Sequence, residues 1–111
     1  MFGLSPWILL SFAIATELIA TTALKASDGF TRLGFGALVV VGYALSFYFL
    51  AITLKQLDLG STYAIWSGAG TAATAIIGVA LFGESLSRLS LAGIALIIAG
   101  VVALQLGGAH G

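Results

Sequence analysis

Apolar residues fill four long stretches of this sequence, and polar residues gather in the short segments between them. The apolar stretches cover residues of about 4–24, 33–54, 60–82 and 89–106. Each is long enough to cross about 30 Å of hydrocarbon, which takes roughly 20 helical residues at about 1.5 Å per residue. A helix satisfies its own backbone hydrogen bonds, which lipid cannot do. The pattern therefore predicts an all-α membrane protein with four transmembrane helices.

The connections between these stretches are short and carry turn signals. Asp28 and Gly29 form a typical turn pair in the first connection, and Gly83 follows the third stretch as a residue that ends a helix. Short connections favour antiparallel neighbours, so we expect residues 1–111 to form a single four-helix transmembrane domain. His110, in the tail after the fourth stretch, is interpreted as a disordered end group.

Composition strengthens this prediction and excludes other classes of protein. Only 7% of the residues are charged and 60% are hydrophobic, whereas soluble domains have about 25% charged residues. The absence of cysteine excludes disulfides and thiolate metal sites, and the net charge of +0 offers no basic surface to nucleic acid. No basic residue precedes the first stretch, which favours a permanent span over a cleaved signal peptide. We predict no enzyme activity, no cofactor and no metal.

The few charged residues also bear on orientation in the membrane. Seven of the eight lie in the three connections. Lys25, Arg32 and Arg88 fall on the side that the first and third connections share, and Lys55 falls on the other side. Membrane proteins orient by an excess of basic residues on the cytoplasmic side, and three against one is a weak excess. We therefore expect that the chain can insert in either orientation.

Glu17 is the one charged residue inside an apolar stretch. An ionisable group near the bilayer centre costs roughly 2.5–3.5 kcal/mol, faces protein or water, and usually marks a transport pathway. Because a low dielectric disfavours the charged form of a carboxyl group, Glu17 is a candidate proton carrier. The structural alternative is a protonated glutamic acid that only forms a hydrogen bond, with Thr21 one turn along the same face as its partner.

Aromatic and small residues recur at helical spacing on the second and third stretches. These residues are Tyr43, Ser46, Phe47 and Leu50 on the second stretch, and Tyr63, Trp66 and Gly70 on the third. An aromatic ring beside a carboxylate suits a large apolar cation, at about 0.5–2 kcal/mol for each desolvated contact. The alternative is that these rings pack against neighbours or mark the membrane interface, as we expect for Trp7.

Glycines supply the remaining signal. Gly68 and Gly70, in "SGAG", lie in the middle of the third stretch, where they allow either a helix bend or a close approach of another helix. Gly93 and Gly100 lie seven residues apart on one face of the fourth stretch, which contains no ionisable side chain within "GIALIIAGV". We interpret the fourth stretch as a dimerisation element.

Together these residues resemble the small multidrug resistance transporters, and the resemblance runs along essentially the whole chain. It rests on the segments "TELIATTALK", "GFTRL", "YAIWSGAG" and "GIALIIAGV". The segments "ATTALK" and "YAIWSG" are similar to the quaternary ammonium, or multidrug, subtype. The guanidinium-exporting subtype usually carries a tryptophan and a glycine near Thr21 and Thr22. Glu84 is a departure at a variable position, and we assign it no role.

The resemblance implies a proton-coupled antiporter for lipophilic aromatic or quaternary ammonium cations. It implies an antiparallel homodimer of dual-topology chains in a bacterial inner membrane, with Glu17 as the shared site for proton and substrate. It places Tyr43, Tyr63 and Trp66 in the pocket, a bend at Gly68 and Gly70, and a dimer contact from Gly93 to Gly100. Our full prediction for the pocket adds Ala13, Thr21, Ser46, Phe47 and Leu50.

Other functions remain open at this point. Within transport, the same chain could export guanidinium, polyamines or lipids, because the size of a cavity cannot be read from a sequence. A proton-carrying ring subunit of a rotary motor also has a carboxylate within the membrane. Such a subunit has no need of the aromatic pair Tyr63 and Trp66, which favours the transporter.

Overall fold

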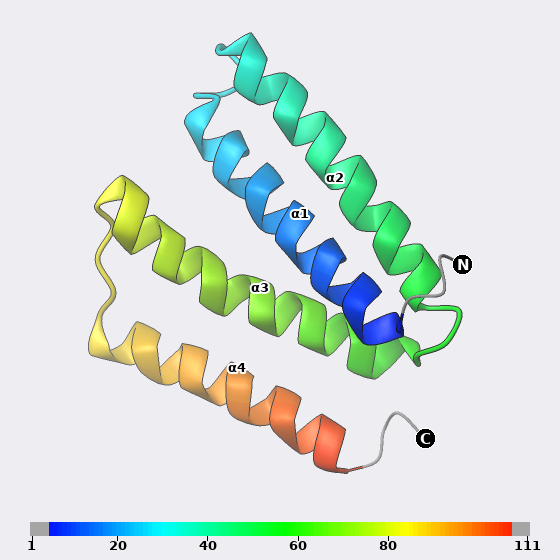
Figure 1. Cartoon of the computed structure of the whole chain (residues 1–111). Coiled ribbons are helices and arrows are strands. Elements are labelled where there is room, and N and C mark those ends of the chain that lie inside the picture. The colour runs from blue at the N-terminus through cyan, green and yellow to red at the C-terminus, as the bar shows by residue number, and fades with distance from the viewer. Residues whose placement is uncertain (1–4, 108–111) are drawn as a thin grey trace. The chain divides into compact units, whose positions relative to one another are not determined.

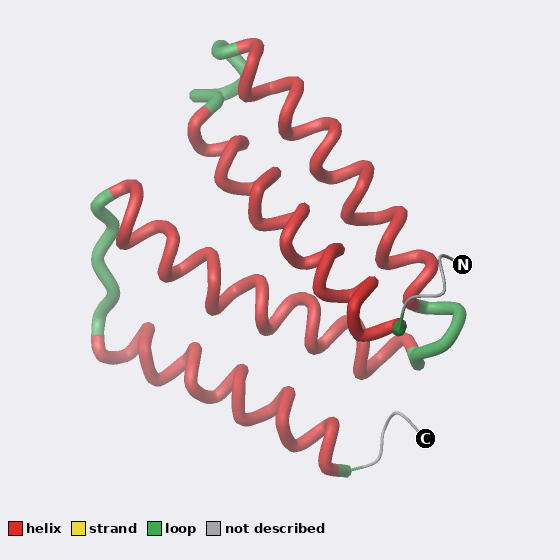
Figure 2. Tube along the Cα trace, in the orientation of Figure 1, coloured by secondary structure: helices red, strands yellow, loops and turns green. Residues whose placement is uncertain are grey.

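The computed structural model describes residues 5–107, and those residues form four helices and no strand (Figures 1 and 2). The helices are α1 (Pro6–Ala26), α2 (Leu33–Thr53), α3 (Leu59–Phe82) and α4 (Arg88–Leu106). They contain 21, 21, 24 and 19 residues, and each is long and apolar enough to cross a membrane. The predicted class, an all-α protein with four membrane-spanning helices, is therefore confirmed. His110 lies outside the described residues.

Side-chain caps explain where three of the helices begin. The side chains of Ser5, Asp58 and Ser87 accept hydrogen bonds of 3.0–3.1 Å from backbone N–H groups in the first turns of α1, α3 and α4. Each cap satisfies a backbone donor that has no partner within its helix. Pro6 stands at the start of α1, where a missing N–H costs nothing.

The end of α3 is also defined by local chemistry. Gly83 has a φ of 67°, a left-handed conformation that glycine adopts without a steric penalty. The backbone N–H of Glu84 donates to the carbonyl of Gly78 at 3.1 Å, and the Glu84 carboxylate lies against the same glycine. Glycine at position 78 therefore leaves room for the Glu84 side chain to fold back over the helix.

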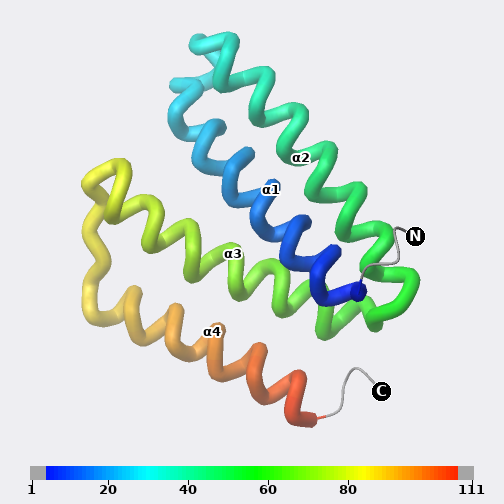
Figure 3. Tube along the Cα trace, viewed as in Figure 1, coloured from blue at the N-terminus to red at the C-terminus, as the bar shows by residue number. Residues whose placement is uncertain are grey.

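The chain consists of two compact units, residues 1–56 and residues 57–111. The first unit holds α1 and α2 as one helical hairpin, and the second holds α3 and α4 as another. In Figure 3 the first hairpin runs from blue to green and the second from green to red. In the first connection Asp28, Gly29 and Phe30 have φ values of 50°, 68° and 67°. The sequence thus places its turn pair where the chain reverses. Whether residues 1–111 act as one domain stays a prediction.

The α1–α2 hairpin is tightly packed because small residues face one another. A Cβ added to Gly42 would lie 2.8 Å from Cβ of Ala20 and 3.3 Å from the carbonyl oxygen of Thr16. These neighbours belong to the backbone of α1 or are fixed to it, so they cannot move aside independently. Close contact through small residues is the usual way in which membrane helices associate.

We expect Gly42→Ala to destabilise the α1–α2 hairpin by about 1–3 kcal/mol, because the new methyl group overlaps α1. The measurement is the denaturing-detergent concentration at which the purified protein loses its helix contacts. Gly34→Ala is the matched control, since no described atom lies within 4 Å of a Cβ at that position of α2. Equal stability of the two variants would contradict this packing.

The α3–α4 hairpin is looser. A Cβ added to Gly68 would lie 2.7 Å from Cγ2 of Val101 and 3.2 Å from Cγ2 of Ile97, so this glycine lets α4 approach α3. Among the described residues, α4 has none that is buried. Its apolar side chains are therefore available to lipid or to another protein chain.

Candidate functional site

Glu17 lies in the middle of α1 and is partly buried. Ala13, one turn before it, and Ala20, on the adjacent turn, are fully buried. One carboxylate oxygen of Glu17, Oε1, accepts a hydrogen bond of 2.8 Å from the Thr21 hydroxyl. The partner that the sequence suggests for Glu17 is therefore the partner that the structure shows.

The hydrogen bond of Glu17 continues across to α2. The Thr21 hydroxyl oxygen lies 2.7 Å from the Tyr43 hydroxyl oxygen. A threonine hydroxyl has a single proton, so when Thr21 donates to Glu17 it must accept from Tyr43. Tyr43, Thr21 and Glu17 thus form a directional chain of hydrogen bonds that ends on the carboxylate and fixes its position.

The second carboxylate oxygen of Glu17, Oε2, has a different environment. It is buried, and no hydrogen-bond partner for it is found within residues 5–107. A buried carboxylate oxygen without a partner is costly, and the cost falls when a proton or a cation binds to it. Glu17 therefore has one oxygen held in place by a hydrogen bond and one buried oxygen whose hydrogen-bonding capacity is not used by the described residues.

The predicted pocket face of α2 divides into two parts. Ser46 is fully buried, and its hydroxyl donates to the Ala13 carbonyl of α1 at 2.7 Å, so it joins the two helices. Leu50 is buried on the same side. The Phe47 ring is 55% exposed and stacks on the Tyr43 ring at 6.5 Å between centroids. Glu17 and the predicted pocket residues of α2 therefore lie at the α1–α2 contact or next to it.

The α3–α4 hairpin carries the other predicted aromatic residues. The rings of Tyr63 and Trp66 meet edge to face, with centroids 5.7 Å apart and planes at 64°. Tyr63 is 56% exposed and Trp66 is partly buried. The two rings therefore form one aromatic surface on α3. Their role in a pocket stays a prediction.

The predicted glycine positions differ in their surroundings. Gly68 contacts α4, and Gly70 is buried, while α3 runs through both as one continuous helix. Gly93 and Gly100 lie on α4, and no described atom comes within 4 Å of a Cβ built at either position. These two glycines leave a face of α4 to which another helix can come close. The bend and the dimer contact both stay predictions.

Sequence reasoning missed Gly42 and the link from Ser46 to the Ala13 carbonyl. A signal was available, because Gly42 and Ser46 are small residues spaced four apart on one face of α2. That spacing is typical of contacts between membrane helices.

Four apolar helices that are long enough to cross a membrane define a multi-pass membrane protein, and a partly buried carboxylate inside one of them is typical of a transport pathway. A model of the family described as Small Multidrug Resistance protein matches residues 5–97, and the chain belongs to this family of multidrug resistance transporters. The resemblance seen in the sequence is thereby confirmed. Members of this family are transporters, a function distinct from that of enzymes.

Individual relatives agree with this assignment. The chain is 45% identical over 100 residues to the quaternary ammonium compound-resistance protein QacE of Escherichia coli, covering 90% of this chain and 91% of QacE. It is 50% identical over 101 residues to the multidrug resistance protein EbrB of Bacillus subtilis (strain 168), covering 91% of this chain and 86% of EbrB. It is also 45% identical over 93 residues to a putative ethidium bromide resistance protein of Escherichia coli, covering 84% of this chain and 81% of that protein.

Proposed function

We propose that this protein is a proton-coupled antiporter that exports lipophilic aromatic or quaternary ammonium cations. The observation that carries the proposal is the state of the Glu17 carboxylate, with Oε1 held by Thr21 and Oε2 buried without a partner among the described residues. The substrate class follows from relatives named for resistance to quaternary ammonium compounds and ethidium bromide.

Coupling arises from competition for one carboxyl group. A proton neutralises Glu17, and so does a monovalent cation, so the two ligands exclude each other. Exchange follows if the binding site turns from one side of the membrane to the other only when Glu17 holds a proton or a cation. The cation then moves out as protons move in. Tyr63 and Trp66 supply aromatic faces for the cation. Tyr43 and Thr21 hold the carboxylate, and Phe47 adds an exposed ring, while Ala13, Ser46 and Leu50 support this lining from the α1–α2 contact, where they are buried.

The transport unit in this proposal is an antiparallel homodimer in a bacterial inner membrane. Four helices enclose little volume, so a cavity for a drug-sized cation requires two chains, which brings two Glu17 carboxyl groups to one pocket. Their titrations then depend on each other. Gly93 and Gly100 provide the dimer contact. Two oppositely inserted chains reproduce the inverted repeats of larger transporters. In this proposal α3 bends at Gly68 and Gly70 when the site changes the side that it faces.

The pH difference and the membrane potential, the two components of the proton gradient, both drive such a cycle. Each pH unit contributes about 1.4 kcal/mol per proton, and each net charge that crosses contributes about 2.3 kcal/mol per 100 mV. An exchange of two protons, one for each Glu17 of the dimer, for one monovalent cation would use both components.

The test is ethidium uptake into vesicles containing the purified protein, with an acidic interior and an alkaline exterior. The proposal predicts accumulation that a protonophore abolishes. Absence of accumulation of both ethidium and guanidinium would contradict it. Uptake of guanidinium without ethidium would retain antiport and replace the multidrug subtype with the guanidinium subtype.

We expect two lysines added to the α2–α3 connection beside Lys55 to shift the ratio of the two orientations, because they change the count of basic residues from three against one to three against three. The chain has no cysteine, so a single cysteine at the exposed Ser85 reports orientation in whole cells through labelling by an impermeant maleimide. Without the lysines, the reagent should label one part of the chains in intact cells and the other part only after the membrane is opened. Identical labelling with and without the lysines would count against dual topology.

We expect Thr21→Val to weaken ethidium binding about fivefold, since it breaks the link from Tyr43 to Glu17, and a membrane hydrogen bond contributes about 1 kcal/mol. The measurement is calorimetric titration at constant pH. Thr22→Val is the matched control, because within residues 5–107 the Thr22 hydroxyl donates only to the Leu18 carbonyl of its own helix, at 2.7 Å. Similar losses in the two variants would show that the chain from Tyr43 does not position the carboxylate.

A further inference from the structure

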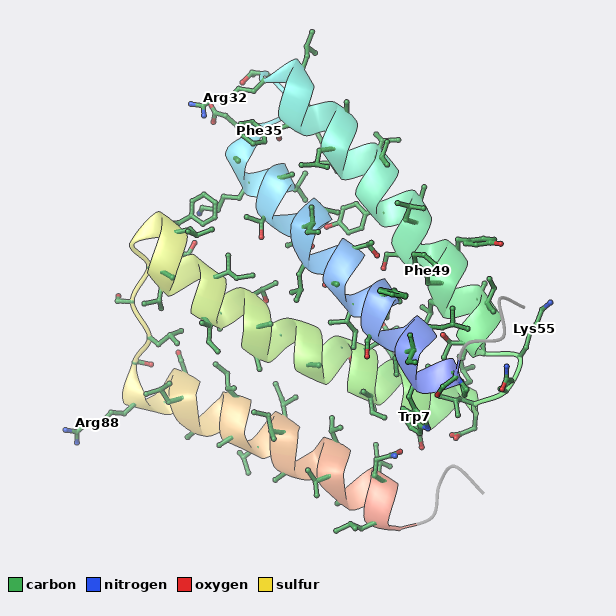
Figure 4. The ribbon with its side chains drawn as sticks, viewed as in Figure 1. Trp7, Arg32, Phe35, Phe49, Lys55 and Arg88 are labelled. Carbon is green, nitrogen blue, oxygen red and sulfur yellow. The ribbon has the colours of Figure 1, made fainter. Side chains whose placement is uncertain are left out.

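An open hollow of about 480 Å³ lies at the beginning of α2, among residues to which the proposed transport site assigns no role. It is lined by Arg32, Gly34, Phe35 and Leu38. Figure 4 shows Arg32 and Phe35 close together at this end of the α1–α2 hairpin. All four lining residues belong to the same hairpin, so the hollow is a feature of that unit alone.

The walls of this hollow are apolar and accessible. Phe35 and Leu38 are 41% and 42% exposed. Gly34 contributes no side chain, and a Cβ built on it would have no described atom within 4 Å. The first turn of α2 therefore leaves a space that a hydrocarbon chain can occupy beside two apolar side chains.

A positive charge stands at the rim of the hollow. Arg32 directly precedes α2, its side chain makes no capping hydrogen bond, and no ion pair of its guanidinium is found in the described part of the chain. Lys25, in the last turn of α1, and Asp28, in the connection, are the other charged residues at this end of the hairpin. Together with Arg32 they leave a net charge of +1, from two basic residues and one acidic residue.

The position of these residues along α2 sets what surrounds them. Because α2 crosses the membrane, its first turn lies where hydrocarbon gives way to headgroups. Arginine at such a boundary extends its guanidinium toward the headgroups while its stem stays beside apolar groups. A guanidinium binds phosphate oxygens through two parallel hydrogen bonds.

We propose that this hollow binds an anionic phospholipid. The phosphate of the lipid contacts Arg32, and the upper part of one acyl chain lies along Phe35 and Leu38 over Gly34. A basic residue beside the membrane favours anionic over neutral lipid by about fivefold in affinity, which corresponds to about 1 kcal/mol.

The test is native mass spectrometry of the full-length protein in neutral detergent, with equal amounts of phosphatidylglycerol and phosphatidylcholine that carry the same acyl chains. Wild-type protein should retain phosphatidylglycerol with a preference of about fivefold. Arg32→Gln should lose this preference, and Arg32→Lys should keep part of it. Arg88→Gln is the matched control, since Arg88 is an exposed arginine at the beginning of another helix and is not among the residues that line this hollow, so this variant should lose less of the preference than Arg32→Gln.

Two further experiments distinguish a bound lipid from other ligands. Gly34→Leu adds an apolar side chain at a position where a Cβ has open space, and it keeps Arg32, so it should reduce retention of phosphatidylglycerol. Excess glycerol phosphate, which has no acyl chain, should leave the bound lipid in place; displacement would indicate a phosphate site and overturn the lipid proposal. An unchanged preference in Arg32→Gln, unchanged retention in Gly34→Leu, or equal retention of both lipids by wild type would also overturn it.

Discussion

Replacement of Glu17 by glutamine is expected to reduce pH-driven ethidium uptake to the level of protein-free vesicles. Glutamine keeps the shape of the side chain and can still accept the hydrogen bond from Thr21, which is 2.8 Å long in the native protein. It cannot take up or release a proton, and it carries no charge to attract a cation. We therefore expect both ligands to lose the shared site proposed for them, while the fold remains.

Glu17→Asp distinguishes the loss of the titratable carboxyl group from a change in its position. Aspartate retains a titratable carboxyl group but shortens the side chain, so the distance to Thr21 changes. We expect reduced uptake with an altered dependence on pH, measured in the same vesicles. Gradient-driven ethidium uptake by Glu17→Gln equal to that of wild type would show that the proton travels by another group.

The second large effect is expected at Trp66. Trp66→Ala removes one of the two rings that meet at 5.7 Å on α3. Loss of a cation–π contact of about 0.5–2 kcal/mol weakens ethidium binding by about two- to thirtyfold. Guanidinium, which is much smaller than ethidium and covers less of an aromatic ring, should lose less. The measurement is the ratio of the two affinities in wild type and variant.

Trp7→Ala is the matched control for this substitution. Trp7 lies in the first turn of α1, is 42% exposed, and is expected at the membrane interface. This variant should bind ethidium and guanidinium as wild type does. If Trp66→Ala weakens both cations equally, then Trp66 only packs against its neighbours.

The number and type of the helices could be predicted because hydrocarbon demands long apolar segments and leaves charges in the connections. The residues at which the helices end were less predictable. The first stretch was expected to end near residue 24, yet α1 continues through Lys25 to Ala26. A lysine in the last turn interacts favourably with the carbonyl end of a helix and extends toward the headgroups, so it does not stop the helix.

The candidate site was predictable only within one helix. The spacing of Glu17 and Thr21 follows from helix geometry, so their hydrogen bond could be expected from the sequence. The contact of Thr21 with Tyr43 depends on the register of α1 against α2. That register is fixed where Gly42 meets Ala20, a close approach that only the packed hairpin shows. Partners across helices therefore required the structure.

The most direct test of the central claim, that proton and cation share Glu17, is calorimetric binding of ethidium to the purified protein from pH 5 to 9 with proton release recorded. For wild type, affinity should rise with pH, and binding should release protons. Glu17→Gln should show neither behaviour. Ethidium binding that is independent of pH and releases no proton in the wild-type protein would contradict the account.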